Sequence, residues 1–488
     1  MKETQKKEVS PFVAMAEGVE NLPKRRIVLN KEYFAGIDSG TYGCNDKFDY
    51  EKADSKEIRI EEGKKEFAGL RILHWEDSAI GVSSEAVAVI RDSYIWGDTQ
   101  YETMPLSGPP GNLLVSGNVR ATLGLGNSQN YYINSTVVSR NWAVLSTDGA
   151  KPAGKGQVEL SLYAYGTAAE ALSGGYASYS DLFCNLYVFG SLFRAPEIGI
   201  ISGSYGRVTL GTVEDGENNA ELSKVLTEKD KAVRADKTLR TVVEGGRNAF
   251  MIHSVNLPPY WEFKGYSKEE LPFYTAEIYA HNSIIGTDLS LDKGVVYEGA
   301  KQAYIDYTSG SSILIKSTNV DFNMDGCELY TDVLGTGYLI QTVYNNDTMF
   351  MNAVPEGETY PGIKISMSRM KVKGDISHED YQRDFRLLLL NAEYYGAINE
   401  YSFEHWKTVC SNNGFSEFCC DEKYKTHHGI HLVMENNSIW VVTANSKLSS
   451  IRIEKGCVVK GRIMLNGKEL NIKDGETYTG TVEVYPLE

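Results

Sequence analysis

A histidine and two basic residues stand out as groups that could transfer a proton and stabilise an anion. His253 ends the mostly apolar segment Arg247-Asn-Ala-Phe-Met-Ile-His253 and precedes the aromatic loop Pro258-Pro-Tyr-Trp261. Imidazole suits general acid or base chemistry at neutral pH without a cofactor. Positive charge on Lys316 and Arg247 would stabilise an enolate or a phenolate. We therefore predict His253, Lys316 and Arg247 as catalytic; the structural alternative is a histidine hydrogen-bonded at a strand end.

Aromatic and polar side chains elsewhere are candidates for binding the substrate. In the segment 142–148, the alternation of an extended strand predicts an aromatic platform beside a carboxylate on one side, formed by Trp142, Val144, Ser146 and Asp148. The structural alternative is a packed Trp142 and an Asp148 that only opens a turn with Gly149. The predicted substrate-binding residues are Trp142, Asp148, Arg120, Tyr176, Tyr179, Gln341 and Asp347.

Two other constellations carry weaker predictions. His427, His428 and His431 form the densest histidine cluster, but no third ligand stands at a convincing spacing, so a metal site there stays open and none is predicted. Carboxylates crowd at 321–328 and at 375–384, the second group being Asp375, Glu379, Asp380 and Asp384. Paired carboxylates are typical of glycoside hydrolysis, yet in a chain of net charge −16 the expected interpretation is a solvated acidic face.

The elements that must position these residues are short strands. Runs with period-two alternation recur along the chain, among them Trp142–Leu145, Ala249–His253, Ala303–Tyr307 and Ser311–Lys316. In the last run, alternation predicts Ile313 and Ile315 in the core, with Leu314 and Lys316 facing outward. The best helical candidates are Glu217–Asp230 and His378–Asp384. Strands joined by single glycines and polar corners, with few hairpin turns, favour an all-β parallel solenoid over a sandwich.

Several segments resemble landmarks of a known group of proteins. Trp142-Ala-Val-Leu-Ser-Thr-Asp148, Gly174-Gly-Tyr-Ala-Ser-Tyr179 and the 247–253 segment resemble bacterial right-handed parallel β-helix proteins of the pectate-lyase-like superfold. These proteins are often labelled adhesin-like and mostly lack an assigned activity. The resemblance covers roughly residues 65–465 and implies a parallel β-helix there. Residues 1–64 match none of these landmarks; we predict that they form an N-terminal cap and first strands, because the open end of a solenoid needs covering, and that 466–488 form C-terminal cap strands. The aspartate patterns of pectate lyases and polygalacturonases are not found.

Composition narrows the partners. The chain has 488 residues, with 65 Asp and Glu against 49 Lys and Arg, which disfavours nucleic acid. No apolar run is long enough to span a membrane, and no secretory signal is recognisable, so a cytoplasmic location is expected. The seven cysteines lack a C-x-x-C pair, which favours free thiols. A homo-oligomer remains open.

These observations predict a cofactor-independent lyase or isomerase. Its substrate would be a small anionic, phenolic or sugar-acid molecule bound along the groove of the solenoid. The alternative hypothesis is a surface adhesin or glycan-binding solenoid without catalysis, whose tyrosines stack on sugars.

Overall fold

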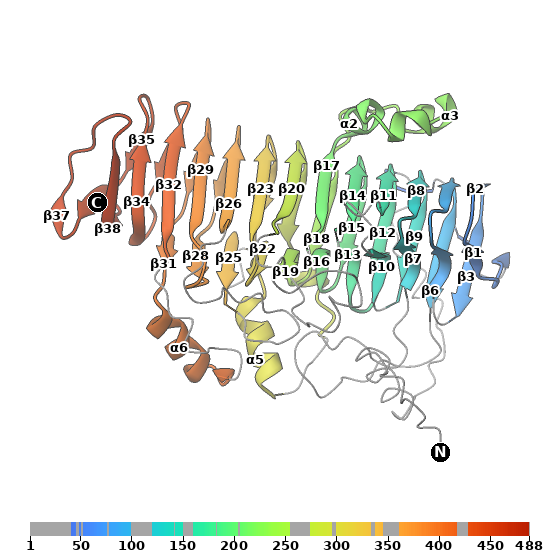
Figure 1. Ribbon diagram of the computed structural model, residues 1–488, viewed down its shortest axis with the longest axis horizontal. Helices are drawn as coiled ribbons and strands as arrows, with labels where there is room; N and C mark the ends of the chain where they lie inside the picture. Colours follow the sequence, from blue (N-terminus) through green and yellow to red (C-terminus); the bar gives the residue numbers. More distant parts are fainter. Residues whose placement is uncertain are drawn as a thin grey trace, which may run out of the picture.

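The chain winds into stacked coils that each contribute three strands. The computed structural model describes residues 41–44, 48–49, 52–75, 78–98, 120–140, 142–149, 160–181, 183–203, 205–253, 274–294, 299–332, 337–344, 361–416 and 428–487. Corresponding strands of successive coils pair in parallel, as β10 with β13 and β13 with β16. The result is a parallel β-helix, as predicted, elongated along its coil axis (Figure 1).

The strands form three parallel sheets. The first sheet consists of β1 (Ile58–Ile60), β4 (Ser78–Val82), β7 (Arg120–Gly126), β10 (Ala143–Gly149), β13 (Tyr176–Asp181), β16 (Ile198–Gly203), β19 (Asn248–His253), β22 (Ile313–Lys316), β25 (Ile340–Val343), β28 (Ile376–Glu379) and β31 (Ile398–Glu400). The second sheet consists of β2 (Lys64–Ala68), β5 (Val87–Arg91), β8 (Gln129–Ile133), β11 (Ser161–Tyr165), β14 (Asn185–Phe189), β17 (Arg207–Gly211), β20 (Ala276–His281), β23 (Val320–Asp325), β26 (Ile363–Ser368), β29 (Phe385–Leu390) and β32 (Ile430–Glu435). The third sheet runs in two stretches, β3 (Arg71–Trp75), β6 (Tyr94–Asp98), β9 (Thr136–Ser139), β12 (Ala168–Ala171), β15 (Leu192–Ala195), β18 (Val242–Gly245), β21 (Ile284–Thr287) and β24 (Glu328–Tyr330), then β27 (Lys371–Lys373), β30 (Glu393–Tyr395), β33 (Ile439–Val441) and β35 (Val458–Lys460).

The corner between the second and third sheets explains the single glycines and asparagines seen in the sequence. One residue there adopts positive φ in coil after coil, for example Asn134 (φ 49), Gly166 (φ 58), Gly190 (φ 50) and Asn282 (φ 44). Glycine and asparagine tolerate this left-handed conformation best. The corner therefore turns the chain by a fixed amount in each coil and keeps the strands in register.

A hydroxyl ladder runs through the same corner. The backbone N–H of Ser93 donates to Ser135 Oγ at 3.2 Å, that of Thr167 to Ser191 Oγ at 3.0 Å and that of Ser191 to Thr241 Oγ1 at 3.4 Å. These bonds satisfy buried backbone donors that face no strand partner. The small polar residues at the corners are thus structural.

The core fills the space inside the three sheets. One inward row of the first sheet is almost wholly aliphatic and stacks coil on coil; its members include Ile80, Ile200, Phe250, Ile313, Ile340, Ile376 and Ile398. Ile315 also belongs to this core, whereas Leu314 packs in a separate cluster outside the sheet, so the predicted alternation of Ser311–Lys316 is confirmed. Val144 is in the core, so the prediction that it faces outward is wrong. The strand bends at that end, and two consecutive residues, Val144 and Leu145, face inward.

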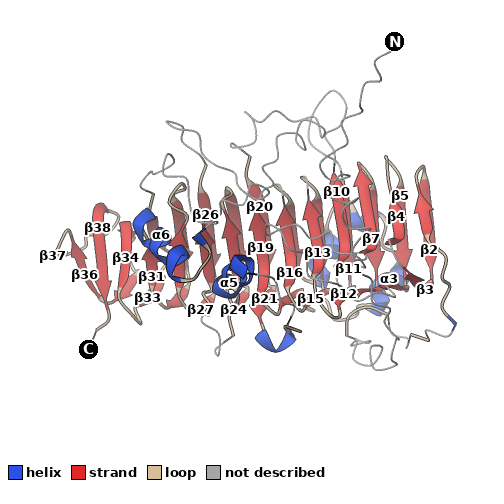
Figure 2. Cartoon of the chain, turned by 90° about the horizontal axis from the view of Figure 1, so that it is seen from below, coloured by secondary structure: helices blue, strands red, loops and turns tan. Residues whose placement is uncertain are grey.

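Helical segments leave the coils at two places. Short helices α2 (Val213–Asn218), η3 (Leu222–Lys224) and α3 (Glu228–Val233) interrupt the corner after β17, replacing the single helix predicted at Glu217–Asp230. Helices α5 (Gly299–Thr308) and α6 (Phe403–Asn412) lie together on another side, with η5 (Leu289–Leu291) before α5 (Figures 1 and 2). The helix predicted at His378–Asp384 is wrong, because β28 occupies its start.

Helix α5 replaces the strand predicted at Ala303–Tyr307. The alternation of Ala303, Ile305 and Tyr307 resembles that of a strand, but the buried residues of α5 are Lys301, Tyr304 and Thr308, whose spacing of three and four places them on one helix face. The side-chain amide of Asn248 donates to the carbonyl oxygens of Thr308 and Ser311 at 3.0 and 2.7 Å. These bonds fix the end of α5 against the first sheet.

Antiparallel strands close the C-terminal end. β34 (Ser446–Ile453) pairs with both β31 and β32, and β38 (Thr477–Tyr485) then pairs with β34 in the opposite direction. β36 (Arg462–Leu465) and β37 (Lys468–Glu469) complete this end. Among the described residues no helix is long and apolar enough to cross a membrane. The described cysteines, Cys44, Cys184, Cys327, Cys410 and Cys457, are free thiols.

Candidate functional site

The outer face of the first sheet carries a row of ionisable side chains. The strand register aligns Asp148 with Asp181, Gly203 with His253, and His253 with Lys316. The same row continues through Val343 to Glu379. We call Asp148, Asp181, His253, Lys316 and Glu379 the ionisable row. Neighbouring strands stand about 4.8 Å apart along the coil axis, so His253 and Lys316 are one spacing apart, whereas Gly203 and Val343 separate the outer members by two spacings.

His253 lies at the centre of this row and has no exposed surface (0%). Burial lowers the pKa of its imidazole well below the usual value, and the positive charge of Lys316 lowers it further. The ring is therefore neutral at pH 7. The Tyr179 ring lies 6.3 Å from it, centroid to centroid. Burial raises the pKa of Tyr179, as do the carboxylates of Asp181 and Asp148, so that phenol keeps its proton.

Gly203 brings Asp181 and His253 together. A Cβ atom at Gly203 would lie 2.8 Å from Asp181 Oδ1 and 3.4 Å from His253 Cε1. Both side chains therefore occupy the space above the same glycine. Any larger residue would push the carboxylate away from the imidazole.

Lys316 places a positive charge beside the imidazole. Its side chain is 4% exposed, and its Nζ lies 5.5 Å from the centroid of the Tyr304 ring. Tyr304 comes from α5, so this helix forms the outer wall of the site at this coil. A buried ammonium near an aromatic face and a neutral imidazole would stabilise an anion held between them.

Glu379 is a buried carboxyl at the far end of the row. Its Oε2 accepts a hydrogen bond from the Tyr307 hydroxyl at 2.8 Å, and its Oε1 accepts one from Ser377 Oγ at 2.5 Å. Burial raises the pKa of Glu379 to about 7, although the hydrogen bonds from Ser377, Tyr307 and Gln341 oppose the shift. A carboxyl with a pKa near neutrality is suited to both accept and donate a proton.

The aromatic residues predicted to bind substrate gather towards the N-terminal coils of the same sheet. The Arg120 guanidinium lies 4.7 Å from the Trp142 ring centroid, and the rings of Tyr176 and Tyr179 are 6.2 Å apart. Ile198, Ile201 and Met251 pack with the aromatic rings into one cluster. Trp142 and Tyr176 stand at the start of their strands, whereas Asp148 stands at the end of β10.

The structure brings some predicted residues together and separates others. His253 and Lys316 are direct neighbours across two strands, and Gln341 lies on the next strand, where its Oε1 accepts a hydrogen bond from Ser311 Oγ at 2.8 Å. Arg247 stands six residues before His253, just before the strand begins, and its Nε lies 3.1 Å from Asp292 Oδ2. Asp347 lies outside the described residues.

Three residues of the site were missed by sequence reasoning. Asp181 follows Tyr179 by two residues and therefore shares its face, a signal that alternation already contained. Glu379 was grouped with carboxylates expected in solvent; that expectation is wrong for Glu379 and Asp380, which are 1% and 0% exposed. Tyr307 was predicted to lie in a strand, so the sequence did not indicate that it would contact Glu379 from a helix.

The histidine cluster adopts a different arrangement. His428 Nδ1 and His431 Nε2 lie 3.2 and 3.3 Å from the same oxygen, Asp384 Oδ1. These two contacts hold the pKa of Asp384 below its usual value, against the effect of burial. His427 lies outside the described residues. Within the described ranges, no group of three or more histidine, cysteine or acidic side chains is arranged to hold a metal ion.

Comparisons with known proteins do not indicate a function for this chain. No protein-family model, curated protein or solved structure matches this chain. The fold class and the ionisable row are therefore the observations on which a function can be argued.

Proposed function

We propose that the ionisable row is the active site of a cofactor-independent lyase or isomerase. The observation that carries this proposal is the direct pairing of His253 with Lys316 in adjacent strands, with Asp181 on the other side of His253 above Gly203. A neutral base, a fixed ammonium and a carboxylate in one buried row are the groups needed to remove a proton next to a carbonyl or carboxylate.

In this mechanism His253 takes the proton and Lys316 stabilises the developing negative charge. A substrate anion bound against Lys316 would be held by the same charge that stabilises its enolate or phenolate form. Glu379 lies three strand spacings from His253, about 14 Å, so His253 itself also returns the proton to the substrate. Transfer to a neighbouring atom gives isomerisation, and transfer to a leaving group gives elimination.

The substrate class follows from the walls of the site. The aromatic cluster of Trp142, Tyr176 and Tyr179 provides apolar contact, and Lys316 provides a positive charge. A small anionic, phenolic or sugar-acid molecule combines a flat or apolar face with negative charge. The parallel coil architecture also supports, as a proposal, a relationship to pectate-lyase-like β-helix proteins.

The decisive test is proton exchange with solvent. The protein is incubated in D₂O with a panel of sugar acids and phenolic acids, and NMR follows both deuterium entering a substrate C–H position and new products. For the responding substrate, we expect His253→Gln to lower the rate by at least about 10²-fold, as is typical for loss of an acid–base group. Lys316→Met should lower it by about 10²-fold, with partial rescue by Lys316→Arg.

Controls separate catalysis from folding. Lys364→Met makes the same substitution at a strand lysine of the second sheet, away from the ionisable row, and should leave the exchange rate unchanged. Circular dichroism confirms that each variant keeps its β-helix. A panel without any exchange in the wild type, or full rates in both His253→Gln and Lys316→Met, would refute the active-site assignment. A crystal soaked with the responding substrate should show it within about 3 Å of the imidazole.

A further inference from the structure

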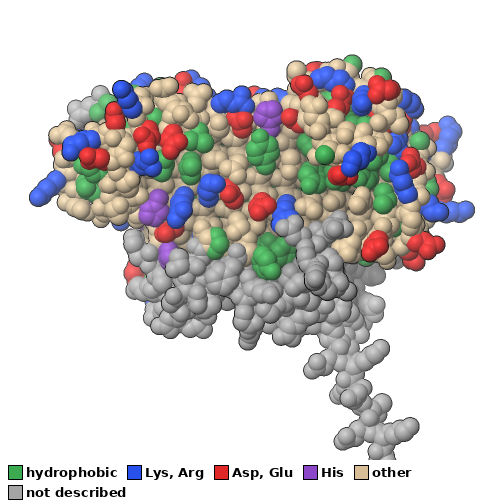
Figure 3. Space-filling model, turned by 45° about the horizontal axis from the view of Figure 1, so that its top comes forward, with side chains coloured by type: hydrophobic (Ala, Val, Ile, Leu, Met, Phe, Trp, Pro, Cys, Tyr) green, Lys and Arg blue, Asp and Glu red, His purple; other side chains and the backbone are tan. Residues whose placement is uncertain are grey.

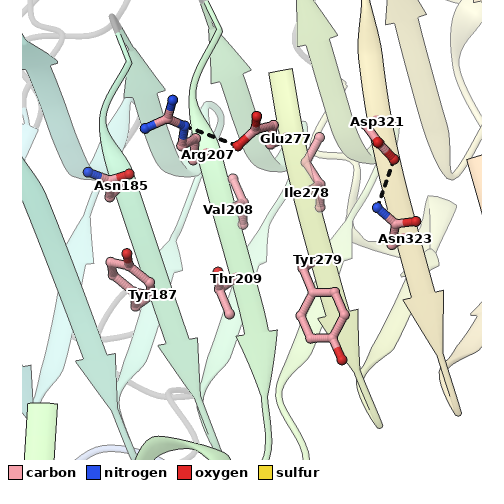
Figure 4. A pocket seen from close by; sticks show the side chains of 10 residues that line it. All are labelled: Asn185, Tyr187, Arg207, Val208, Thr209, Glu277, Ile278, Tyr279, Asp321 and Asn323. Carbon is pink, nitrogen blue, oxygen red and sulfur yellow. Dashed lines mark hydrogen bonds and ion pairs between the residues drawn. The ribbon is translucent and has the colours of Figure 1, made fainter. Parts of the chain in front are cut away.

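The second sheet has an open groove on its outer face, away from the ionisable row. The groove has a volume of about 380 Å³ and lies over β14, β17, β20 and β23. Its lining residues are Asn185, Tyr187, Arg207, Val208, Thr209, Glu277, Ile278, Tyr279, Asp321 and Asn323 (Figure 4). Charged side chains of both signs are interspersed over this face of the molecule (Figure 3).

A tyrosine ladder leads into the groove and is interrupted there. The register aligns Tyr131, Tyr163 and Tyr187 on three successive coils. Their rings stack with centroids 4.5 and 4.7 Å apart and interplanar angles of 5° and 9°. On the next coil the same position is Thr209, and on the coil after that it is Tyr279. The groove is thus the place of a missing ring in the ladder.

The missing ring leaves a gap of defined width. Tyr187 and Tyr279 belong to positions two strand spacings apart, about 9.6 Å. A ring seated midway would stand about 4.8 Å from each tyrosine, close to the 4.5 and 4.7 Å at which the rings of the ladder stack, so the gap has room for one ring in contact with both. Tyr279 is 49% exposed, so the face of its ring is available to stack on a ligand in the groove.

The polar rim of the groove fits a neutral partner. Arg207 Nε lies 3.1 Å from Glu277 Oε2, and Lys364 Nζ lies 3.0 Å from Asp321 Oδ2, so both carboxylates of the rim face a cation. Asn323 Nδ2 donates to Asp321 Oδ1 at 2.7 Å. Paired charges and amides donate and accept hydrogen bonds without a net charge, which suits hydroxyl groups better than an ionic ligand.

We propose that this groove binds a neutral saccharide, with one sugar ring seated over Thr209 between Tyr187 and Tyr279. The apolar face of the sugar contacts the tyrosines, and its hydroxyl groups bond to the rim formed by Arg207, Glu277 and the amide side chains. This site is separate from the proposed active site, which lies on the first sheet. Failure of one proposal therefore leaves the other standing.

Calorimetric titration of the full chain tests the site. The probes are neutral hexaoses of α- and β-linked glucose, the monosaccharide glucose, an acidic oligogalacturonate and N-acetyltyrosine amide as a flat aromatic probe. We expect a neutral hexaose to bind. Tyr279→Ala should weaken that binding about tenfold, which corresponds to the loss of one stacking contact. Thr209→Tyr should abolish it, because the new ring completes the ladder and fills the gap.

The controls make every outcome decisive. Tyr395→Ala removes a tyrosine from the third sheet and should leave binding unchanged. Both groove variants alter side chains on the outer face, and circular dichroism checks their folding. Weaker binding of glucose than of the hexaose identifies a polymer as ligand, and equal binding identifies a free sugar; either result supports the site. No binding of any neutral saccharide, preference for oligogalacturonate or the aromatic amide, or unchanged binding in both variants would overturn the proposal.

Discussion

Replacing Glu379 by glutamine should change how the stability of this protein depends on pH. Burial raises the pKa of Glu379 from 4.5 to about 7, so between these values the folded chain holds a proton that the unfolded chain releases. The free energy of unfolding contributed by this group is therefore fully present below about pH 4.5 and falls as pH rises towards 7. A shift of this size corresponds to about 3 kcal/mol.

Glutamine keeps the shape of the protonated acid and can still accept the hydrogen bond from the Tyr307 hydroxyl. It has no proton to lose, so the variant should not share this decline. The difference in the free energy of unfolding between Glu379→Gln and the wild type should grow in favour of the variant from pH 4.5 to 7. Above pH 7 the difference should stay constant. Other titrating groups are common to both proteins and cancel in the comparison.

Denaturant unfolding at a series of pH values measures this difference directly. Glu469→Gln, at an exposed position near the C-terminal end, is the matched control and should show no such trend. Circular dichroism and intrinsic fluorescence should give the same transition if unfolding is two-state. A constant difference across the whole range, or a variant that loses stability relative to the wild type as pH rises, would show that Glu379 is ionised in the folded protein and would refute the reasoning.

Three further substitutions test other parts of the structure. Burial lowers the pKa of His378 from 6.5 to about 4, so the wild type should lose about 3 kcal/mol relative to His378→Leu as pH falls through that range, measured by denaturant unfolding. Gly203→Ala should lower the proton-exchange rate with little change in the melting temperature, because its Cβ displaces only the end of the Asp181 side chain. Arg383→Met should cost about 3–5 kcal/mol of unfolding free energy, since it leaves the Asp380 carboxylate buried without its cation. Equal melting temperatures of Arg383→Met and the wild type would contradict this last expectation.

The fold could be predicted because each coil repeats the same local physics. Period-two alternation set the inward and outward residues of Ser311–Lys316, and the structure confirms them. Single glycines and asparagines marked the corners, where the structure shows positive φ at Asn134 and Gly166 among others. Parallel coils then require side chains from distant segments to align. The prediction that His253 and Lys316 could stand side by side followed from that requirement alone.

The parts of the site that the sequence did not predict come from segments that leave the coils. Excursions between strands have no period, so the helix that brings Tyr304 and Tyr307 over the first sheet was interpreted as another strand. Without that helix, Glu379 belonged to an acidic stretch expected in water. Burial raises the pKa of Glu379, while the hydrogen bond from Tyr307 of α5 opposes that shift, and no pattern within 375–384 contains either effect. Arg247 does not lie beside His253, because the six extended residues between them span about 20 Å.

The outer faces of the first and second sheets differ at the ionisable row and at the groove. Helices α5 and α6 bury Leu314 and Val343 on the outside of the first sheet, and the ionisable groups beside them lose water. Desolvation there lowers the pKa of His253 and raises that of Glu379, which favours the neutral form of each group. Over the groove of the second sheet, Tyr279 stays half exposed and the rim charges are paired at the surface. Such a surface can stack on and hydrogen-bond a ligand but has little means of activating it. The covered row therefore suits the proposed proton transfer, and the open groove suits the proposed binding of a saccharide.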